Sequence, residues 1–369
     1  MSEEWPTARV VHIKGGIRAV NKYGPPVHLH PEALNNKLAT FETRSYGSLF
    51  NSLETRQLPI IGVEFYTYSH QFEGTALPEW RVFSRDASTV WGNEEGSQLW
   101  SNIGTGAHKE KNGRLWDVAS RVSHQLGVCS WRLKEISESY KDQLNTLVKK
   151  NEFEACSRFS DRYTWLCYMA IQSFLFDACI LRDYLAEYAA HYVFGGLIIG
   201  KTPNVSSLSG LRKIILNKAE SDDELFREFR DITGDDGWLK ILGSYRDLVA
   251  HSAPLAQAEK RLFAICETLP INDDKLPIIC CPIPKNPLEI AASRSKGDLF
   301  EDFEKQFKLF VGMATEEGPH IDGLDYCHEV MSELSKLANK LGGRSPVKPQ
   351  MMVLDKSNII GEVKVETIK

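Results

Sequence analysis

The stretch SDRYTWLCYMAIQSFLFDACILRDYLAEYAAHYVF (160–194) carries the strongest helical signal in the chain and decides its fold class. Ser160 or Asp161 can cap the start of this helix, and the pair Gly195-Gly196 can end it. Such a helix is on the order of 50 Å long, which is more typical of a helical bundle than of an α/β domain. Its apolar residues recur at spacings of three and four, as on one face of a helix: Phe174, Ala178, Leu181, Leu185, Tyr188 and Tyr192.

Further segments on both sides of this stretch show helical spacing. The segment 221–232 opens with Ser221 and Glu224 in the order of a capping box. We therefore predict an α-helical bundle over residues 116–270. Its other helices are expected at 115–150 (interrupted near Gly127), 207–218, 235–251 and, beyond Pro254, 255–269.

The two ends of the chain have a different character. Residues 1–115 are rich in Gly, Thr and aromatic residues, and short alternating runs at 9–14 and 59–72 indicate a β-rich N-terminal domain. The segment IGTGAHKEKNG (103–113) is expected to be a loop, and it lacks the residue order of a phosphate-binding loop. The predicted fold class is therefore α+β, mainly α.

Residues 271–369 are expected to form a mixed C-terminal extension. The segment 270–287 contains five prolines and is predicted to be a linker or an extended arm. Helical patterns follow in DLFEDFEKQFKLFVGM and GLDYCHEVMSELSKLANKLGG. Alternation in the last residues indicates two short strands, which could pair with the N-terminal sheet.

Composition limits the possible partners and compartments. The chain has 369 residues and a net charge of −5, so a nucleic-acid partner would have to meet a local basic patch. Its eight cysteines include no CxxC pair and several lie in apolar runs, which favours a reducing, cytoplasmic location. The first residues do not resemble a signal peptide, and no membrane span or membrane partner is expected.

The segment SYRDLVAH (244–251) places Arg246 five residues before His251 at the end of a predicted helix. This arrangement resembles the HEPN family, in which an arginine, four to six residues and a histidine stand near the end of a late helix. The resemblance covers about residues 155–270. It implies a metal-independent endoribonuclease that works as a homodimer without a cofactor, with RNA as substrate. It also implies a role in anti-phage defence or a toxin–antitoxin system, with a regulatory partner or antitoxin.

The chemistry of these residue types fits RNA cleavage. A histidine can act as general acid or base near neutral pH, and an arginine fork matches the charge of the phosphate in the transition state. Asp247 could orient His251 or pair with Arg246, and Asp177 and Ser252 are candidates for supporting roles. Positions five apart on a helix point about 140° away from each other, so Arg246 and His251 would need a second copy to complete one site.

Two other readings remain open on the sequence alone. In one, the bundle is a non-catalytic dimerisation or binding module, the N-terminal domain senses a ligand, and Arg246, Asp247 and His251 form a structural network. In the other, His28 and His30 bind zinc with a third ligand such as His12 or His70. No spacing demands this zinc site, so no metal is expected.

Overall fold

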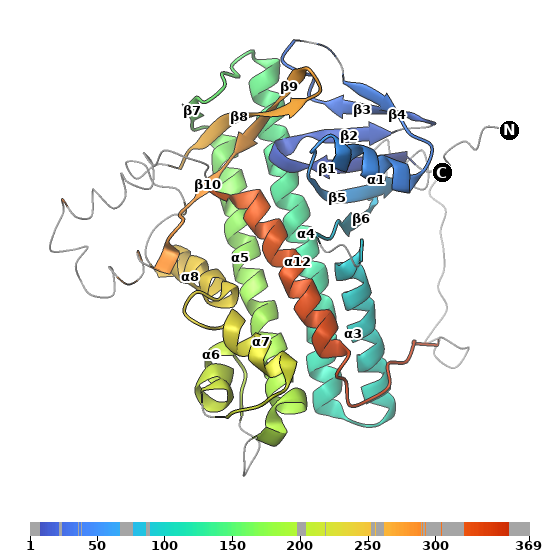
Figure 1. Cartoon of the computed structure of the whole chain (residues 1–369), viewed down its shortest axis with the longest axis vertical. Helices are drawn as coiled ribbons and strands as arrows, with labels where there is room; N and C mark the ends of the chain where they lie inside the picture. The colour runs from blue at the N-terminus through green and yellow to red at the C-terminus, as the bar shows by residue number, and fades with distance from the viewer. Residues whose placement is uncertain are drawn as a thin grey trace, which may run out of the picture.

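The computed structural model describes residues 8–21, 24–35, 37, 39–66, 77–85, 89–197, 204–217, 219–251, 255, 262–288, 290, 292, 304 and 321–353. In this part of the chain helices predominate over strands, so the predicted α+β, mainly α class is confirmed. Four long helices run side by side, and an antiparallel sheet lies across one end of them (Figure 1).

The long helices form the body of the molecule. They are α3 (Gly92–Lys109), α4 (Gly113–Lys149), α5 (Arg162–Tyr188) and α12 (Gly323–Gly342). Helix α4 packs against both α3 and α5, and α12 packs across all three. The predicted cap of α5 is confirmed, because the Asp161 carboxylate accepts a hydrogen bond from the Thr164 backbone N–H. A single hydrophobic core therefore contains residues from the N-terminal, central and C-terminal parts of the chain.

The N-terminal sheet has six antiparallel strands in the order β4-β3-β2-β1-β5-β6. Side chains alternate between its faces, so Val11 and Val63, which are paired in register, are buried on the face that is covered by helix α1 (Tyr46–Thr55). The opposite face is polar and meets α4. The strands are β1 (Ala8–Ile13), β2 (Arg18–Asn21), β3 (Pro26–His30), β4 (Thr40–Glu42), β5 (Ile60–Tyr66) and β6 (Glu79–Val82).

A second, three-stranded sheet joins the bundle to the first sheet. It has the order β7-β8-β9, and a two-stranded ladder of β10 and β11 leads into α12. The buried Asp322 closes this junction: it accepts hydrogen bonds from the Tyr140 hydroxyl at 2.7 Å and from the Cys281 backbone N–H at 3.0 Å, and it caps α12. The strands are β7 (Arg158–Phe159), β8 (Ala264–Ile271), β9 (Asp274–Cys280), β10 (Pro282–Ile283) and β11 (Ile321–Asp322).

A cluster of short helices packs beside the C-terminal half of α5. Helix α5 continues through the π-helical turn η2 (Ala189–Val193) into the 3-10 turn η3 (Gly195–Leu197). The next elements are α6 (Leu208–Leu211), η4 (Arg212–Leu216), α7 (Glu224–Ile232) and α8 (Trp238–His251). Helix α8 has the apolar stripe that its sequence predicts, and this stripe packs on α5.

Two expectations based on glycine are wrong. The segment 103–113 is not a loop, because α3 extends to Lys109. Gly106 serves close packing, because a Cβ there would lie 2.5 Å from the Lys348 carbonyl oxygen. Helix α4 also runs through Gly127 without interruption. A Cβ at this position would have no atom within 4 Å, so no close contact requires a glycine here.

The predicted helix at 255–269 and the linker at 270–287 are also wrong in the described residues. Residues 264–280 form the β8–β9 hairpin, which turns at Asn272 with a positive φ of 49°. In this fold Pro277 is tolerated because β9 is an edge strand. The capping box predicted from Ser221 and Glu224 does not begin α7, because the N-cap of this helix is Asp223.

Other expectations concern parts of the chain outside the description. The predicted C-terminal strands and nearly all of the helix at 298–313 lie outside the described residues. The eight cysteines all lie within them, and each is a free thiol.

One described segment, Arg162–Val193, is long and apolar enough to cross a membrane by length and composition, contrary to expectation. Half of its most apolar window is buried inside the protein. Its packing against α4, α8 and α12 accounts for that half, and core helices commonly pass the same test.

Substitution of Gly16 by alanine should weaken the contact between the N-terminal sheet and α4. Gly16 has a φ of 96°, and a Cβ there would lie 2.8 Å from the Tyr140 carbonyl oxygen of α4. We expect the free energy of unfolding in urea to fall by about 2 kcal/mol or more. The matched control is Gly47→Ala in α1, where nothing lies within 4 Å. Equal stability of the two variants would contradict this role of Gly16.

Candidate functional site

A surface hollow of about 630 Å³ lies beside α8, and it is the best candidate for a ligand site among the described residues. Its walls come from α5, α6, η4, α8 and the segment after β10. Five of the lining side chains are cationic and only one, Asp247, is a carboxylate. The chain as a whole has a net charge of −5, and Asp183, Asp235 and Asp247 pair with three of the five cations, so the hollow keeps a local excess of positive charge. The cations are Arg182, Arg212, Lys213, Lys240 and Arg246.

Arg182 is fixed at the base of the hollow. Its guanidinium donates to the Leu239 carbonyl at 3.4 Å and to Asp183 Oδ1 at 3.2 and 3.3 Å. Gly243 of α8 makes room for it, because a Cβ there would lie 2.6 Å from Arg182 Nη1. This positive charge is therefore held in place before any ligand arrives, which lowers the entropic cost of binding an anion.

Arg246 lies on the wall of the hollow, and about a third of its side chain is exposed. Its Nη2 pairs with Asp247 Oδ1 at 2.9 Å. This ion pair is one of the two roles predicted for Asp247. Its Nε is buried and has no hydrogen-bond acceptor among the described residues. A buried N–H group without an acceptor costs free energy.

The structure separates the other predicted site residues from the hollow. His251 is exposed at the last residue of α8, and it does not belong to the described lining. Asp177 does not support Arg246: it accepts a hydrogen bond from Arg132 Nε at 2.8 Å and contacts Gln125, both on α4. Asp177 lies on the side of α5 that faces α4, and α8 packs on another side. Ser252 lies outside the described residues.

Of the five cations that line the hollow, the sequence predicted Arg246 alone as a site residue and not Arg182, Arg212, Lys213 or Lys240. On α8, Lys240, Gly243, Ser244 and Arg246 lie outside the apolar stripe that was recognised, and all four line the hollow. These positions could have been read as a candidate site. Arg212 and Lys213 come from η4, which only the tertiary structure places against α8.

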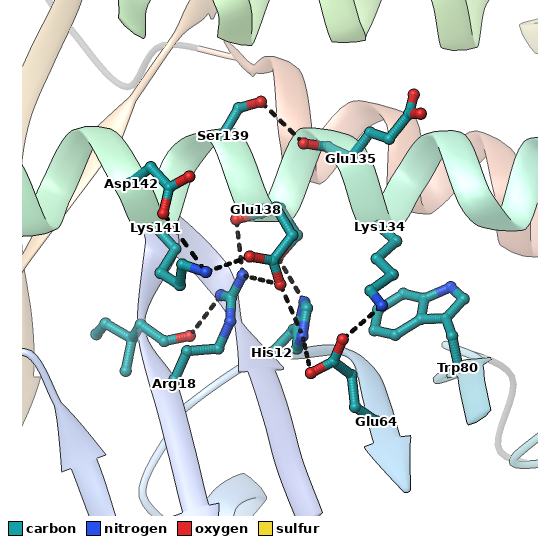
Figure 2. Close-up of polar contacts among 12 residues, drawn as sticks. His12, Arg18, Glu64, Trp80, Lys134, Glu135, Glu138, Ser139, Lys141 and Asp142 are labelled. Carbon is teal, nitrogen blue, oxygen red and sulfur yellow. Dashed lines mark hydrogen bonds and ion pairs between the residues drawn. The ribbon is translucent and has the colours of Figure 1, made fainter. Parts of the chain in front are cut away.

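A second polar cluster lies between the N-terminal sheet and α4 (Figure 2). His12 Nδ1 is 3.1 Å from the Ser137 hydroxyl. Its Nε2 lies 3.7 Å from Glu64 Oε2 and 3.5 Å from Glu138 Oε1. These three residues are the one group among the described residues that could hold a metal ion, since their ligand atoms lie within 4.8 Å of one another. Neither His28 nor His30 belongs to this group, and His70 lies outside the described residues.

The charges around this cluster do not favour a metal ion. Lys134 Nζ lies 2.5 Å from Glu64, Arg18 lies 3.6 Å from Glu138, and Lys141 pairs with Glu138 as well. These cations already neutralise the carboxylates, so a divalent ion would leave an excess of positive charge in a largely buried place. The cluster is a network of ion pairs that joins the sheet to α4.

The network has a distinct protonation pattern. Burial, and next the charge of Arg18, lowers the pKa of His12 to about 4, so this imidazole is neutral at pH 7. Burial opposes ionisation of Glu64, but its contacts with His12 and Lys134 outweigh burial and hold the pKa of that carboxyl well below its usual range. Because His12 is uncharged at pH 7, the neighbouring charge that stabilises the Glu64 carboxylate comes from Lys134.

Comparison of the chain with protein-family models, with curated proteins and with solved structures finds no match in any of the three. The chemistry of the hollow beside α8 is therefore the basis for proposing a function.

The buried histidines predict that acid destabilises the protein. His328 of α12 resembles His12: its Nδ1 accepts from Arg85, its Nε2 faces the Phe83 carbonyl, and burial lowers its pKa to about 4. An unfolded histidine has a pKa near 6.5, so the unfolded chain binds more protons between about pH 6.5 and 4. Each histidine should lower the free energy of unfolding by up to about 1.4 kcal/mol per pH unit in that window as pH falls.

Asp322 acts in the opposite direction, because burial raises its pKa to about 6 and the folded protein then binds the extra proton. It offsets about one of the two histidines below pH 6. Urea unfolding at pH 7, 6 and 5 measures the slope, which should decrease in His328→Gln and stay unchanged in the control His124→Gln on the exposed side of α4. Stability that rises from pH 7 to pH 5 in the wild-type protein would contradict the prediction.

Proposed function

We propose that the hollow beside α8 binds RNA phosphates and that the protein is a metal-independent endoribonuclease, with Arg246 as the phosphate clamp and His251 as a general acid or base. The observation that carries this proposal is the set of five cations in one hollow of an acidic chain. Arg246 belongs to that set and has a buried Nε without an acceptor among the described residues.

Phosphate is the anion that best suits this hollow. Arginine forks donate two hydrogen bonds to two oxygens of one phosphate, and lysines add charge without fixed geometry. A chain of phosphates would use cations that are spread over several elements, as these are over α5, η4 and α8. The hollow is open and has no aromatic side chain in its described lining, so it suits a backbone more than a single base.

Cleavage in this proposal follows from proton transfer. The 2′-hydroxyl of the ribose attacks the phosphorus, a base accepts its proton, and an acid gives a proton to the leaving 5′-oxygen. The products are a 2′,3′-cyclic phosphate and a 5′-hydroxyl. His251 is accessible for one of these roles, and Arg246 would stabilise the additional charge on the phosphate. The two residues diverge on α8, so each site would combine Arg246 of one subunit with His251 of another.

A second function, RNA binding without cleavage, has specific support. Arg246 pairs with Asp247 within its own helix, and His251 lies outside the described lining of the hollow. In a binding module the cations would hold RNA or another polyanion, and His251 would be a surface residue that the C-terminal end of the helix dipole favours.

RNA cleavage in EDTA tests the catalytic proposal. We expect the wild-type protein to cut total RNA and to leave cyclic phosphate ends, while Arg246→Ala and His251→Ala each lose about 10²- to 10⁴-fold in rate. The exposed residues Arg230 and His124 serve as matched alanine controls.

A mixture of Arg246→Ala and His251→Ala chains should recover about a quarter of the wild-type rate if each site uses both subunits, because half of the dimers are mixed and have one intact site. A wild-type rate in His251→Ala would exclude the catalytic role of His251, whereas absence of cleavage by the wild-type protein would leave the binding module.

RNA affinity tests the hollow independently of cleavage. Lys213→Ala and Arg212→Ala should each weaken binding of a non-hydrolysable 2′-O-methyl RNA, and each should reduce the slope of log K against log salt by about 0.7 to 0.9 if one phosphate contact is lost. Arg230→Ala should leave the slope unchanged. Equal slopes for all four proteins would show that RNA does not bind in this hollow.

A further inference from the structure

Helix α5 exposes an apolar stripe that no described part of the chain covers. Its five residues are separated by one, three, seven and four positions, and at 100° per residue these separations keep them on one side of the helix. Most of these side chains are at least 40% exposed, and the stripe consists of Trp165 (59%), Leu166 (49%), Met169 (57%), Phe176 (40%) and Ile180 (40%). Contiguous apolar patches of this size on a protein surface usually mark an interaction site.

The opposite sides of α5 are already apolar and buried. They pack against α4, α8 and α12 through residues such as Phe174, Leu181 and Leu185. A helix that is apolar around its whole circumference normally lies inside a core. The stripe therefore indicates that another surface covers α5, in the same way that α4 and α12 cover its inner sides.

A hollow of about 520 Å³ interrupts the N-terminal half of the stripe. Leu166, Met169 and Ser173 of α5 line it together with Trp131 of α4, which is itself 44% exposed, and with charged side chains of α4 that include Lys134 and Glu135. Phe176 and Ile180 project from the C-terminal half. One end of the stripe thus offers a hole and the other end offers large side chains to fill such a hole.

We propose that this stripe is the interface between two copies of the chain, which pair through α5 in an antiparallel, two-fold arrangement centred between Gln172 and Ser173. This register places Met169 opposite Phe176 of the second copy, so that each Phe176 enters the hollow of the other chain. It also places Trp165 opposite Ile180. Such an interface is isologous, because the same patch serves both subunits.

Charge complementarity favours a second copy over a different occupant. The stripe begins at the exposed Arg162 and ends at Asp183, whose carboxylate is 31% exposed and already accepts hydrogen bonds from Arg182 and the Leu208 backbone N–H. In the proposed register each Arg162 faces Asp183 of the other chain. A lipid membrane would gain nothing from this arrangement of opposite charges at the two ends of an apolar stripe.

The area is also adequate for a dimer. Buried aromatic side chains contribute about 150–250 Å² each, so the stripe and Trp131 together expose on the order of 600 Å². A stable interface buries about 800 Å² per partner, and the flanking residues of α4 and α8 would supply the rest. Burying Ser173 at the centre of the interface costs little free energy, because its hydroxyl already donates a hydrogen bond to the Met169 carbonyl.

The same register has a consequence for the RNA site, and this part of the inference rests on the proposed function. Helix α8 runs antiparallel to α5 along one flank of the stripe: Leu239 contacts Arg182, and Leu242 contacts Cys179. A two-fold axis that lies in the interface keeps both α8 helices on the same flank. Each step of one residue along α8 therefore corresponds to a step of one residue backwards along α5. Continued to the end of α8, this pairing places Arg246 level with about position 175 of α5 and His251 level with about position 170. Arg246 of one chain is then level with His251 of the other.

The mass of the protein in solution tests the interface without RNA. We expect size-exclusion chromatography with light scattering to give twice the chain mass of 41.7 kDa at about 20 µM, well above the dissociation constant of a standard-size interface. The charged variants Met169→Asp and Phe176→Asp should be monomers with unchanged circular dichroism, since both side chains are exposed in the single chain. The matched control is Trp116→Asp, which replaces an exposed tryptophan on α4 away from the stripe and should remain a dimer.

A cysteine at the two-fold axis tests the register. In a chain in which the exposed Cys156 is first replaced by serine, Ser173→Cys should form a disulfide-linked dimer under mild oxidation, and Trp116→Cys should not. A monomeric wild-type protein, or a dimer that survives both charged substitutions, would overturn the proposed interface. Absence of RNA cleavage in a wild-type protein that is a dimer would instead overturn the proposed function and leave the interface intact.

Discussion

The pairing of buried charges between the N-terminal sheet and α4 is the constraint on which the arrangement of this fold depends. Charged groups leave water only when a partner replaces their hydration, so each buried group fixes the position of its partner. Arg18 donates to the Ser137 carbonyl at 2.8 Å, and Lys134 pairs with Glu64. A rotation of the sheet or a one-residue slip of β1 against β5 would separate these groups. The sheet is therefore held in one register on a helix that also organises the bundle.

Helix α4 transmits that constraint to the rest of the chain. Tyr140 stands on α4 between the paired residues Glu138 and Lys141, and its hydroxyl donates to Asp322, the residue that caps α12. Gly16 sits against the backbone of the same turn of α4, and its neighbour Gly15 sits against Ile278 of β9. The first strand pair, the β8–β9 hairpin and the last described helix thus meet at one place, although they are far apart in the sequence (Figure 1).

The sequence predicted those parts of the fold in which local signals and tertiary packing agree. Helices α5 and α8 have apolar stripes and recognisable ends, so they were found. The β8–β9 hairpin was missed because its apolar run follows a helical pattern and its prolines suggested a linker. The turn signal in INDD, where Asn272 adopts a positive φ, was the local evidence for a hairpin. In α3, Gly106 contributes to the glycine content that was misread as a loop, but it serves contact with the segment near Lys348, and close packing between distant segments leaves no local signal.

The candidate site shows the same limit and also how α5 unites the functional surfaces. A motif of two residues identified Arg246 as part of a cationic hollow, but it could not identify Arg182, which reaches that hollow from α5 because Gly243 leaves space for it. The same helix presents Phe176 and Ile180 on another face. A substitution that rotates α5 would therefore change both the positive charge of the hollow and the exposed stripe. If two chains pair through that stripe, the position of Arg182 relative to α8 is coupled to the interface, because one rigid helix carries both.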